Sequence, residues 1–530
     1  NETFIRNINT EYNRTVNYRG ALTFNYNTQP KNIKPFSKIS FPKSAYFNLI
    51  KDFNFNTTPK SISFRTDIDR NYNKTKLRNL SNSNMLILPT YNKYFSWNRS
   101  YEIKYDLMRT LKLDFAVNQK ANIDEPTGEI DKSDPFYKEK MDTIWNNFWN
   151  FGRGTNYHQT FGLNYQVPFN KIPIINFISL NTRYNANYDW TAALPAISYL
   201  GNTIQNSNSK QYNGQINFTT LYNKVPYFKK LNQGSSRRGG GRNSVRNRQE
   251  QEENDGKKKK FEFLKHITRF ALGVKNVSIN YSQNQGTFLP GYLNQSKVLG
   301  QDWAQLSPGL PFAFGSQKDI RLSAGRNGWI SKSTALNSMY KTNSSQNLTL
   351  RSTVEPVKQF SIELTANKTT SNNHTEYYRW DDNINDFNSF SPTESGSFSI
   401  SFISLRTAFR ADNDNNESEI FNKFRDYRNE IAQQLAKNNS NFNGVLDPLT
   451  GYPVEYDNND TLLTGGYGAT SQEVMIPAFL AAYSGSNPSN SRLTSFPAIP
   501  LPNWRIIYDG FIKIPYIKKR FKQFTIGHAY

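Results

Sequence analysis

Residues 177–190 read FISLNTRYNANYDW, and their side chains change character at every step. One set comprises Ile178, Leu180, Thr182, Tyr184, Ala186, Tyr188 and Trp190, and the other comprises Ser179, Asn181, Arg183, Asn185, Asn187 and Asp189. Successive side chains of a β-strand point to opposite faces, so this period of two predicts a strand with one apolar and one polar face. The polar face is too polar for the core of a β-sandwich.

A strand of this kind suits an antiparallel transmembrane β-barrel, in which lipid covers the outer face and water fills the interior. The expected lipid-facing residues are Ile178, Leu180, Tyr184, Tyr188 and Trp190, with the last aromatics in an interfacial girdle. The expected lumen-facing residues are Ser179, Asn181, Arg183, Asn185, Asn187 and Asp189.

The same alternation recurs along the chain. It predicts strands near residues 14–27, 61–70, 97–107, 111–120, 157–168, 177–190, 211–222, 261–282, 346–354, 359–369, 396–410, 503–512 and 521–530. Their lengths match or exceed the roughly 9–11 residues that a tilted strand needs to cross a bilayer.

Composition supports a wet interior. Hydrophobic residues make up 36% of the 530 residues, whereas aromatic residues reach 15%. Disordered chains are poor in aromatics. A barrel with a polar lumen explains both values, because it needs apolar residues only on its outer belt.

Charge and cysteine content limit the binding partners and the chemistry that we expect of the chain. The net charge is +23, spread along the chain without a nucleic-acid-binding motif. This charge indicates either solvated basic loops or contact with anionic lipid, and it argues against nucleic acid. The absence of Cys excludes disulfides and thiolate chemistry within these residues.

No apolar run approaches the roughly 18 residues of a transmembrane helix. Residue 1 is Asn, no signal peptide precedes it, and the last residues still alternate as Phe524, Ile526, His528 and Tyr530. We therefore expect an interior piece of a longer polypeptide, with the chain continuing or cut at its end.

Connections between predicted strands are of two kinds. Short ones carry Pro and Lys, at 170–173, 223–226, 355–358 and 513–515, and Pro marks where strand pairing stops. Long polar ones cover 121–156, 283–345, 370–395 and 411–500. Short turns at one rim and long loops at the other are typical of outer-membrane barrels.

These features divide the chain into five parts. Residues 1–233 carry barrel strands with a helical insertion near 121–156, 234–260 form a basic low-complexity loop, and 261–410 carry strands with long loops. Residues 411–500 form a long insertion, and 501–530 return to strands. Apolar residues at helical spacing predict helices at 136–149 and 417–437, which either pack on the barrel mouth or act as a plug, cap or partner-binding surface.

Catalytic and metal signals are weak. The four histidines, His158, His266, His374 and His528, have no metal-ligand spacing, so we expect neither an enzyme nor a cofactor. Carboxylates at Asp124, Glu125, Glu129, Asp131 and Asp134 could bind Ca²⁺, but a solvated acidic turn is favoured. The loop at 411–416 offers the same two alternatives.

Several stretches together resemble one family. They are Phe53-Asn54-Phe55, the run Pro59-Lys60-Ser61-Ile62-Ser63-Phe64-Arg65-Thr66-Asp67, the segments Tyr72 to Asn79 and Phe95 to Arg99, the turn Val167 to Pro173, and Tyr188-Asp189-Trp190. From about residue 50 onward the chain resembles the C-terminal part of the SprA/Sov family of Bacteroidetes. That family forms the outer-membrane translocon of the type IX secretion system and is tied to gliding motility.

The resemblance implies a single-chain barrel of about 36 strands. It implies export of folded cargo proteins that bear a C-terminal secretion signal. It also implies a PorV-like barrel protein and a periplasmic plug protein as alternating partners, next to the lipid bilayer and lipopolysaccharide. Alternatives that the residues leave open are an outer-membrane nutrient transporter or porin, a β-rich surface adhesin and, last, an outer-membrane hydrolase.

Overall fold

Antiparallel β-structure dominates the computed structural model. It describes residues 1–39, 44–80, 86–130, 132, 134–226, 228–229, 272–357, 359–407, 410–414, 417–438, 452–453, 455–456, 462–463, 467–490, 493 and 496–530. Within these residues, fourteen strands form one sheet in the order β1-β2-β5-β6-β7-β8-β9-β10-β11-β12-β13-β17-β18, and β14 also pairs with β13. The all-β prediction is therefore confirmed. The basic loop predicted at 234–260 lies outside the described residues.

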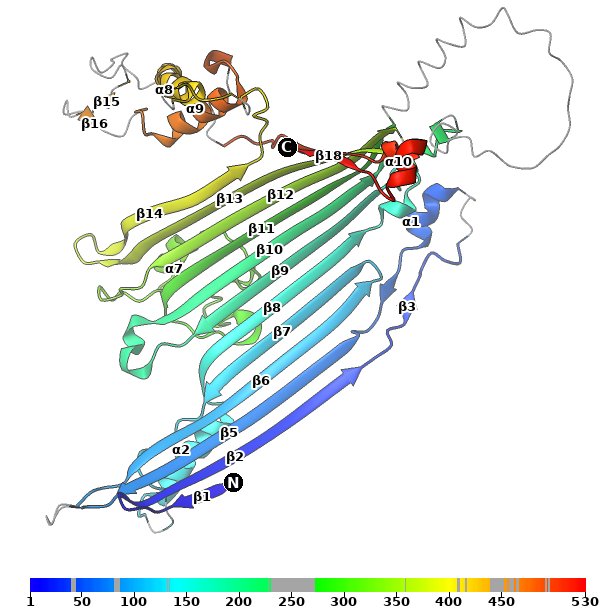
Figure 1. Cartoon of the computed structure of the whole chain (residues 1–530). Helices are drawn as coiled ribbons and strands as arrows, with labels where there is room; N and C mark the ends of the chain where they lie inside the picture. The colour runs from blue at the N-terminus through cyan, green and yellow to red at the C-terminus, as the bar shows by residue number, and fades with distance from the viewer. Residues whose placement is uncertain are drawn as a thin grey trace, which may run out of the picture. The chain divides into compact units, whose positions relative to one another are not determined.

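The sheet strands are long and follow one another in chain order (Figure 1). Their bounds are β1 (Glu2–Ile5), β2 (Thr10–Asn27), β5 (Ser61–Leu77), β6 (Thr90–Met108), β7 (Leu111–Asn122), β8 (Arg153–Val167), β9 (Ile178–Thr191), β10 (Asn202–Asn217), β11 (Val274–Tyr292), β12 (Tyr340–Val357), β13 (Phe360–Asp381), β14 (Asp386–Ile400), β17 (Asn503–Tyr508) and β18 (Ile526–Ala529). Short pairs outside this sheet are β3 (Asn32–Ile33) with β4 (Phe55–Asn56) and β15 (Glu455–Tyr456) with β16 (Leu462–Leu463).

Helices occur in the connections. The α-helices are α1 (Asn48–Lys51), α2 (Tyr137–Trp149), α3 (Phe218–Tyr222), α6 (Leu310–Ala313), α7 (Arg321–Arg326), α8 (Glu419–Lys437), α9 (Gln472–Ser484) and α10 (Pro515–Arg520). The 3₁₀ turns are η1 (Ala45–Phe47), η2 (Phe169–Lys171), η3 (Pro195–Leu200), η4 (Val298–Gly300), η5 (Pro488–Asn490) and η6 (Gly510–Lys513). Helices α2 and α8 lie where helical spacing predicted them. No helix among the described residues is long and apolar enough to cross a membrane.

Two compact units make up the described chain. The first comprises Asn1–Gln215, Asn280–Gln346 and Ser371–Gly396, and the second comprises Ile216–Ile279, Asn347–Thr370 and Ser397–Tyr530. Strands β10 to β14 contribute residues to both units.

Several sequence predictions at strand ends are wrong. The supposed long loop 370–395 is the end of β13, a four-residue turn and most of β14. The last part of β13 reads TTSNNHTEYY, which is polar on both faces and therefore lacks the alternation that identifies a strand. Residues 218–222 form α3, with Asn217 as its N-cap through a hydrogen bond from Thr220, and the described residues 401–407 and 410 are not in a strand.

In the second unit, β14 and β17 lie on the same edge of β13. Phe360 to Thr365 pair with Asn503 to Tyr508, and just beyond them the Ser401 N–H donates to the Asn367 carbonyl oxygen at 2.9 Å. The Leu501 N–H in turn donates to the Ser401 carbonyl oxygen at 2.9 Å. The chain therefore leaves the edge of β13 after Ser401 and returns to it at Leu501. Residues 402–500 are an insertion between β14 and β17, two strands that pair with the same edge of β13.

Candidate functional site: the polar face and its groove

Cross-strand register sorts the side chains of the first unit onto two faces. Residues directly opposite one another in an antiparallel pair point to the same face, so the register can be followed from β2 to β9. One face carries, at the end of the strands nearest the 109–110 turn, the apolar belt of Leu22, Phe24, Tyr26, Ile62, Phe64, Tyr101, Ile103, Leu111, Leu113, Leu163, Tyr165, Ile178 and Leu180. Leu22 and Phe24 are 64% and 57% exposed, which leaves apolar surface without a protein partner.

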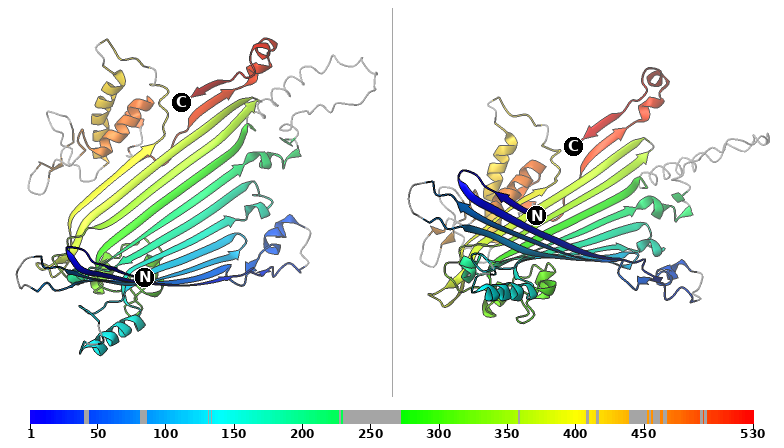
Figure 2. Two further views of the ribbon diagram at one scale, coloured as in Figure 1. Left: turned by 60° about the horizontal axis from the view of Figure 1, so that its bottom comes forward. Right: turned by 90° about the horizontal axis from the view of Figure 1, so that it is seen from below.

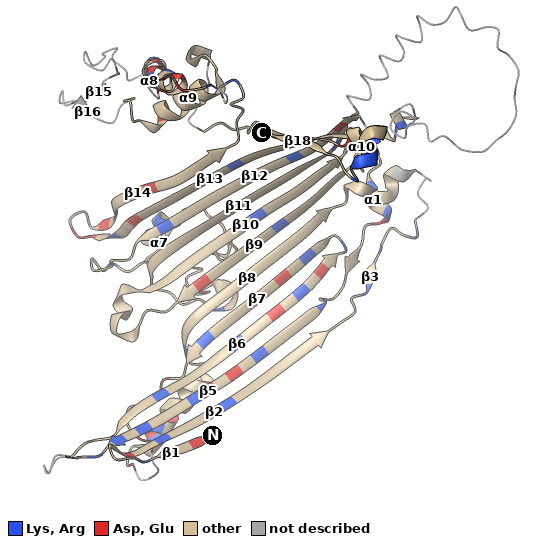
Figure 3. Cartoon of the chain, viewed as in Figure 1, with Lys and Arg blue, Asp and Glu red and all other residues tan. Residues whose placement is uncertain are grey.

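The opposite face is predominantly polar. Neighbouring strands are linked there by side-chain pairs: Asn71 donates to Asn17 at 2.5 Å, Asn73 donates to Asn13 at 2.8 Å, and Arg19 lies 3.2 Å from Asp69. Charges of both signs occur on strands β5, β6 and β7, and β8 to β11 carry few charges (Figure 3). This polar face offers water many hydrogen-bonding groups and no apolar belt.

The six residues predicted to line a lumen lie on the polar face. Ser179, Asn181, Arg183 and Asn187 are exposed, and Asn185 and Asp189 are partly exposed. Ile178 and Leu180 lie on the other face, in the apolar belt. The alternation in the sequence therefore predicted correctly which residues share a face of β9.

The prediction of lipid contact is wrong for Tyr188 and Trp190. Both are buried, because the connection 293–339 folds back over their end of the apolar face. The Tyr188 hydroxyl lies 2.6 Å from Ser296 Oγ, and the Trp190 indole N–H donates to the Asn294 carbonyl oxygen at 3.0 Å. Tyr184, which is half-buried, donates to the Phe314 carbonyl oxygen at 2.5 Å.

A charged cluster anchors the same connection. Arg321 bridges Asp319, at 2.8 Å, and the buried carboxylate of Glu376, and its guanidinium lies 4.7 Å from the ring centre of Tyr340. Burial alone would raise the pKa of Asp319, but hydrogen bonds from the Arg321 side chain and backbone N–H outweigh burial and lower it. The cluster attaches α7 to β12 and β13.

The connection 123–152 covers the first strands of the same face, and Figure 2 shows α2 and the 293–339 connection on one side of the sheet. Its carboxylates pair with bases: Glu125 with Arg70 at 2.5 Å, and Glu129 with Lys74 at 2.6 Å. Asp124 pairs with Arg153 at 2.7 Å, and Asp134 with Lys140 at 2.6 Å. Four of the five carboxylates considered for Ca²⁺ are thus held in ion pairs, and Asp131 lies outside the described residues. For the 411–416 loop, Asn413 pairs with Glu417 and residues 415–416 are not described.

Two histidines form pairs with nearby carboxylates. His158 lies directly opposite Asp189 on the polar face, with Nδ1 2.5 Å from Oδ1, and His374 lies 3.3 Å from Glu376. His528 is exposed in β18, and His266 lies outside the described residues. Among the described residues, no group of three or more His, Cys, Asp and Glu could hold a metal ion.

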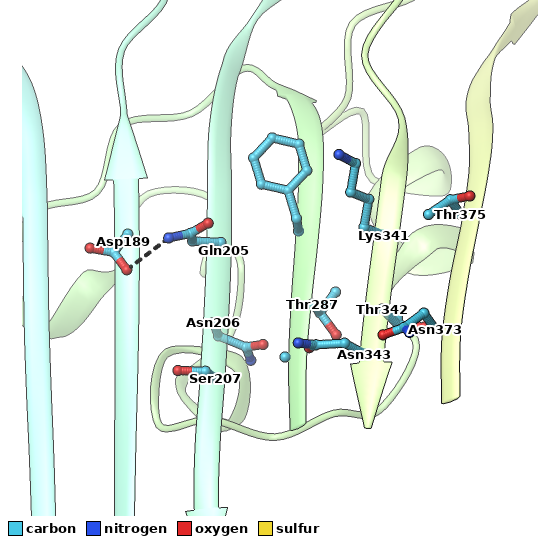
Figure 4. A pocket seen from close by; sticks show the side chains of 12 residues that line it. Asp189, Gln205, Asn206, Ser207, Thr287, Lys341, Thr342, Asn343, Asn373 and Thr375 are labelled. Carbon is cyan, nitrogen blue, oxygen red and sulfur yellow. Dashed lines mark hydrogen bonds between the residues drawn. The ribbon is translucent and has the colours of Figure 1, made fainter. Parts of the chain in front are cut away.

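A groove of about 470 Å³ opens on the polar face where β9 to β13 of the first unit lie side by side (Figure 4). Asp189, Gln205, Ser207, Gly286, Phe288, Lys341, Asn343, Asn373 and Thr375 contribute to its lining. Asp189 accepts a hydrogen bond from Gln205 Nε2 at 3.2 Å. Gly286 lets the Asn343 side chain lie against the floor of the groove, because a Cβ there would lie 2.5 Å from Asn343 Oδ1.

This groove was not predicted from the sequence. Lys341 and Asn343 lay in the supposed loop 283–345, and Asn373 and Thr375 in the supposed loop 370–395. No local motif marks the groove, because its lining comes together only when the five strands β9 to β13 lie side by side.

Comparisons with known proteins give little further identification. No family model matches the sequence, and a search of the curated proteins found no match. A solved structure of a mutant ferric enterobactin receptor from Pseudomonas aeruginosa, in complex with enterobactin, is similar at 8% sequence identity with a TM-score of 0.19. The match covers 72% of this chain and 43% of the receptor chain.

Proposed function

We propose that this chain forms part of the wall of a very wide outer-membrane β-barrel that conducts folded proteins to the cell surface. The observation that carries the proposal is the division between the apolar belt and the predominantly polar face. In hydrocarbon only helices and closed barrels satisfy all backbone hydrogen-bonding groups, so a sheet with such a belt suits a barrel wall.

The direction of each face follows from its chemistry. The apolar belt faces lipid, and the half of the same face that is covered by 123–152 and 293–339 stands clear of the bilayer. The polar face lines the lumen. Its amide, hydroxyl and charged groups bind water well, and isolated aromatic residues such as Tyr94 and Phe288 give folded cargo no continuous apolar surface to adhere to.

The kind of cargo is inferred from the resemblance to the SprA/Sov family. By that resemblance the barrel closes with about 36 strands, exports proteins with a C-terminal signal through the type IX secretion system, and supports gliding motility. A PorV-like barrel protein and a periplasmic plug protein are the partners that the resemblance implies.

Deletion of the gene tests this function. We expect a reporter with a C-terminal secretion signal to accumulate in the periplasm and to return to the surface when the gene is restored. Normal surface delivery in the deletion strain, with no periplasmic reporter, would contradict the proposal. A small-solute uptake defect with normal secretion would instead identify a transporter or porin.

A further inference from the structure

We infer that Arg99 and the aromatic residues around it form a binding site for the phosphate group of a membrane lipid. The inference rests on one part of the proposed function, namely that the apolar belt meets lipid, and it does not require that the barrel conducts proteins. It starts from a contrast among the cations that share a face with the belt.

Arg99 differs from these other cations because it has no carboxylate partner. On strands β2 to β9, the face with the belt carries six Lys and Arg residues, namely Arg14, Arg70, Lys74, Lys76, Lys93 and Arg99. The first five each lie within 4.0 Å of a glutamate oxygen. Arg99 forms no ion pair with any residue that the structure describes.

The Arg99 guanidinium is also partly shielded from water. Its Nε is buried without a hydrogen-bond partner, and its Nη2 donates to the Phe151 carbonyl oxygen at 3.4 Å. Its Cζ lies 5.4 Å from the ring centre of Trp97 and 5.2 Å from that of Phe151. Burial of a cation without a counter-ion is costly. A phosphate that accepts hydrogen bonds from the Nη atoms would supply the missing negative charge.

Phe151 is held beside Arg99 in an unusual backbone conformation. It follows the end of α2 with a φ of 64°, in the left-handed region where the end of a helix usually places Gly. This conformation is unfavourable for a bulky side chain, and such strain is common at ligand sites. Here it places the Phe151 ring against both Arg99 and Trp97, with 5.5 Å between the two ring centres.

Exposed aromatic rings next to Arg99 favour a lipid over a free phosphate ion. Trp145 and Trp149 of α2 are 50% and 72% exposed, and both contact Phe148. Phe148 in turn stacks on Trp97, with 4.8 Å between the ring centres. Trp is enriched where lipid headgroups meet acyl chains, because its ring is apolar and its N–H is polar.

The belt begins at Arg99 and offers a surface to the acyl chains. Arg99 lies opposite Thr66, and Thr66 lies opposite Leu22, so that these residues share one row across β6, β5 and β2. The next row of the same face contains Tyr101 and Phe24, which are both exposed. A lipid whose phosphate binds Arg99 therefore has room to lay its chains along the belt, whereas a free phosphate would use none of this surface.

The test measures lipid binding to the protein in a nonionic detergent. Native mass spectrometry gives the affinities for dioleoylphosphatidic acid and for dioleoylglycerol, which has the same chains without the phosphate, and calorimetry gives the affinity for inorganic phosphate. We expect phosphatidic acid to bind at least about tenfold more tightly than either of the other two.

Variants of Arg99 assign the binding to this residue. Arg99→Gln should weaken the binding of phosphatidic acid about tenfold. Arg99→Lys keeps the charge but lacks the planar guanidinium, and it should weaken binding about threefold. Lys112→Gln removes one exposed charge from the polar face of β7 and is the matched control, so it should bind as the unmodified protein does. Resistance to unfolding in lipid-free detergent verifies that each variant is folded.

Four results would overturn the inference. They are binding of dioleoylglycerol as tight as that of phosphatidic acid, unchanged binding in Arg99→Gln, an equal loss in Lys112→Gln, and binding of inorganic phosphate as tight as that of the lipid, which would assign Arg99 to a free anion. If Arg99→Gln does not fold, unchanged binding in Arg99→Lys overturns the inference instead. The belt is tested separately by Leu113→Lys: a high cost of that variant in vesicles confines a failure to the phosphate site, and no cost would discard the lipid-facing belt as well.

Discussion

The hydroxyl of Tyr188 lies 2.6 Å from Ser296 Oγ, and both residues are buried. This contact joins β9 to a connection 108 residues further along the chain. It shows that the apolar face has two parts: a belt that no protein covers, and a region covered by the chain itself.

Removing this hydroxyl should destabilise the covered region. Tyr188→Phe leaves the Ser296 hydroxyl buried without its partner, which costs about 1–3 kcal/mol. Chemical unfolding in detergent should show the loss. Tyr18→Phe is the matched control, since Tyr18 is 58% exposed on the same face and should change stability by less than about 0.5 kcal/mol. Equal stability of the Tyr188 variant and the unmodified protein would contradict the contact.

A charge in the apolar belt should be costly, and the same charge on the polar face of the same strand should not be. Leu113→Lys places an ammonium in the region assigned to lipid, with an expected cost of about 2–4 kcal/mol for folding into vesicles. Ala116→Lys lies on the opposite face of β7, where Glu102 is directly across, and should cost under about 1 kcal/mol. Similar costs for both variants would refute the assignment of faces.

Acid should release the 293–339 connection. The pKa of Asp319 is lowered from its ordinary value of 3.8, so its ion pair with Arg321 stabilises the fold above that pH, and the stabilisation is lost as pH falls through the lower folded-state pKa. Limited proteolysis with pepsin should therefore cut this connection faster as pH falls below about 3.8. Asp319→Asn should be cut readily already at pH 5–6 with a protease active there. A pH-independent pattern in the unmodified protein would count against the cluster.

The insertion 402–500 should be removable. Its two ends meet at Ser401, whose hydroxyl donates to the Leu501 carbonyl oxygen at 2.7 Å, so a short Gly-Ser linker can join β14 to β17. We expect the shortened protein to reach the membrane fraction and to keep the unfolding resistance of the sheet. Replacing 294–338 by a similar linker is the contrasting variant, and it should be destabilised because it uncovers Tyr188 and Trp190. Loss of the sheet in the first variant would show that the insertion is required for strand pairing.

Alternation predicted much of the sheet, because the belt and polar-face residues differ sharply in polarity. In β9, Leu180 and Asn181 are such a pair, and the strand was predicted almost to its ends. The ends of the strands were not predicted where both faces of a strand are polar. The segment from Thr369 to Asn373 in β13 has no apolar face, and its strand structure depends on pairing with β12 and β14.

The coverage of Tyr188 and Trp190 could not be predicted from the sequence. A Tyr or Trp at the end of an alternating strand suits either an interfacial girdle or a buried hydrogen bond, since both place the ring in apolar surroundings and the polar atom near a partner. Only the path of 293–339 decides between them. The groove was missed for a related reason, because Lys341, Asn343 and Asn373 become neighbours only when β12 and β13 lie side by side.

The central claim is that one face of β9 meets lipid and the other meets passing protein. Because these 530 residues include no Cys, Asn181→Cys and Leu180→Cys each introduce one thiol into this part of the chain, on adjacent positions of opposite faces. The decisive measurement is disulfide crosslinking in cells to a secreted reporter that carries one Cys and is stalled during export. We expect a crosslink through Asn181→Cys and none through Leu180→Cys, which should react instead with a lipid-soluble maleimide. Crosslinking through Leu180→Cys, or through neither position while the reporter is stalled, would contradict it.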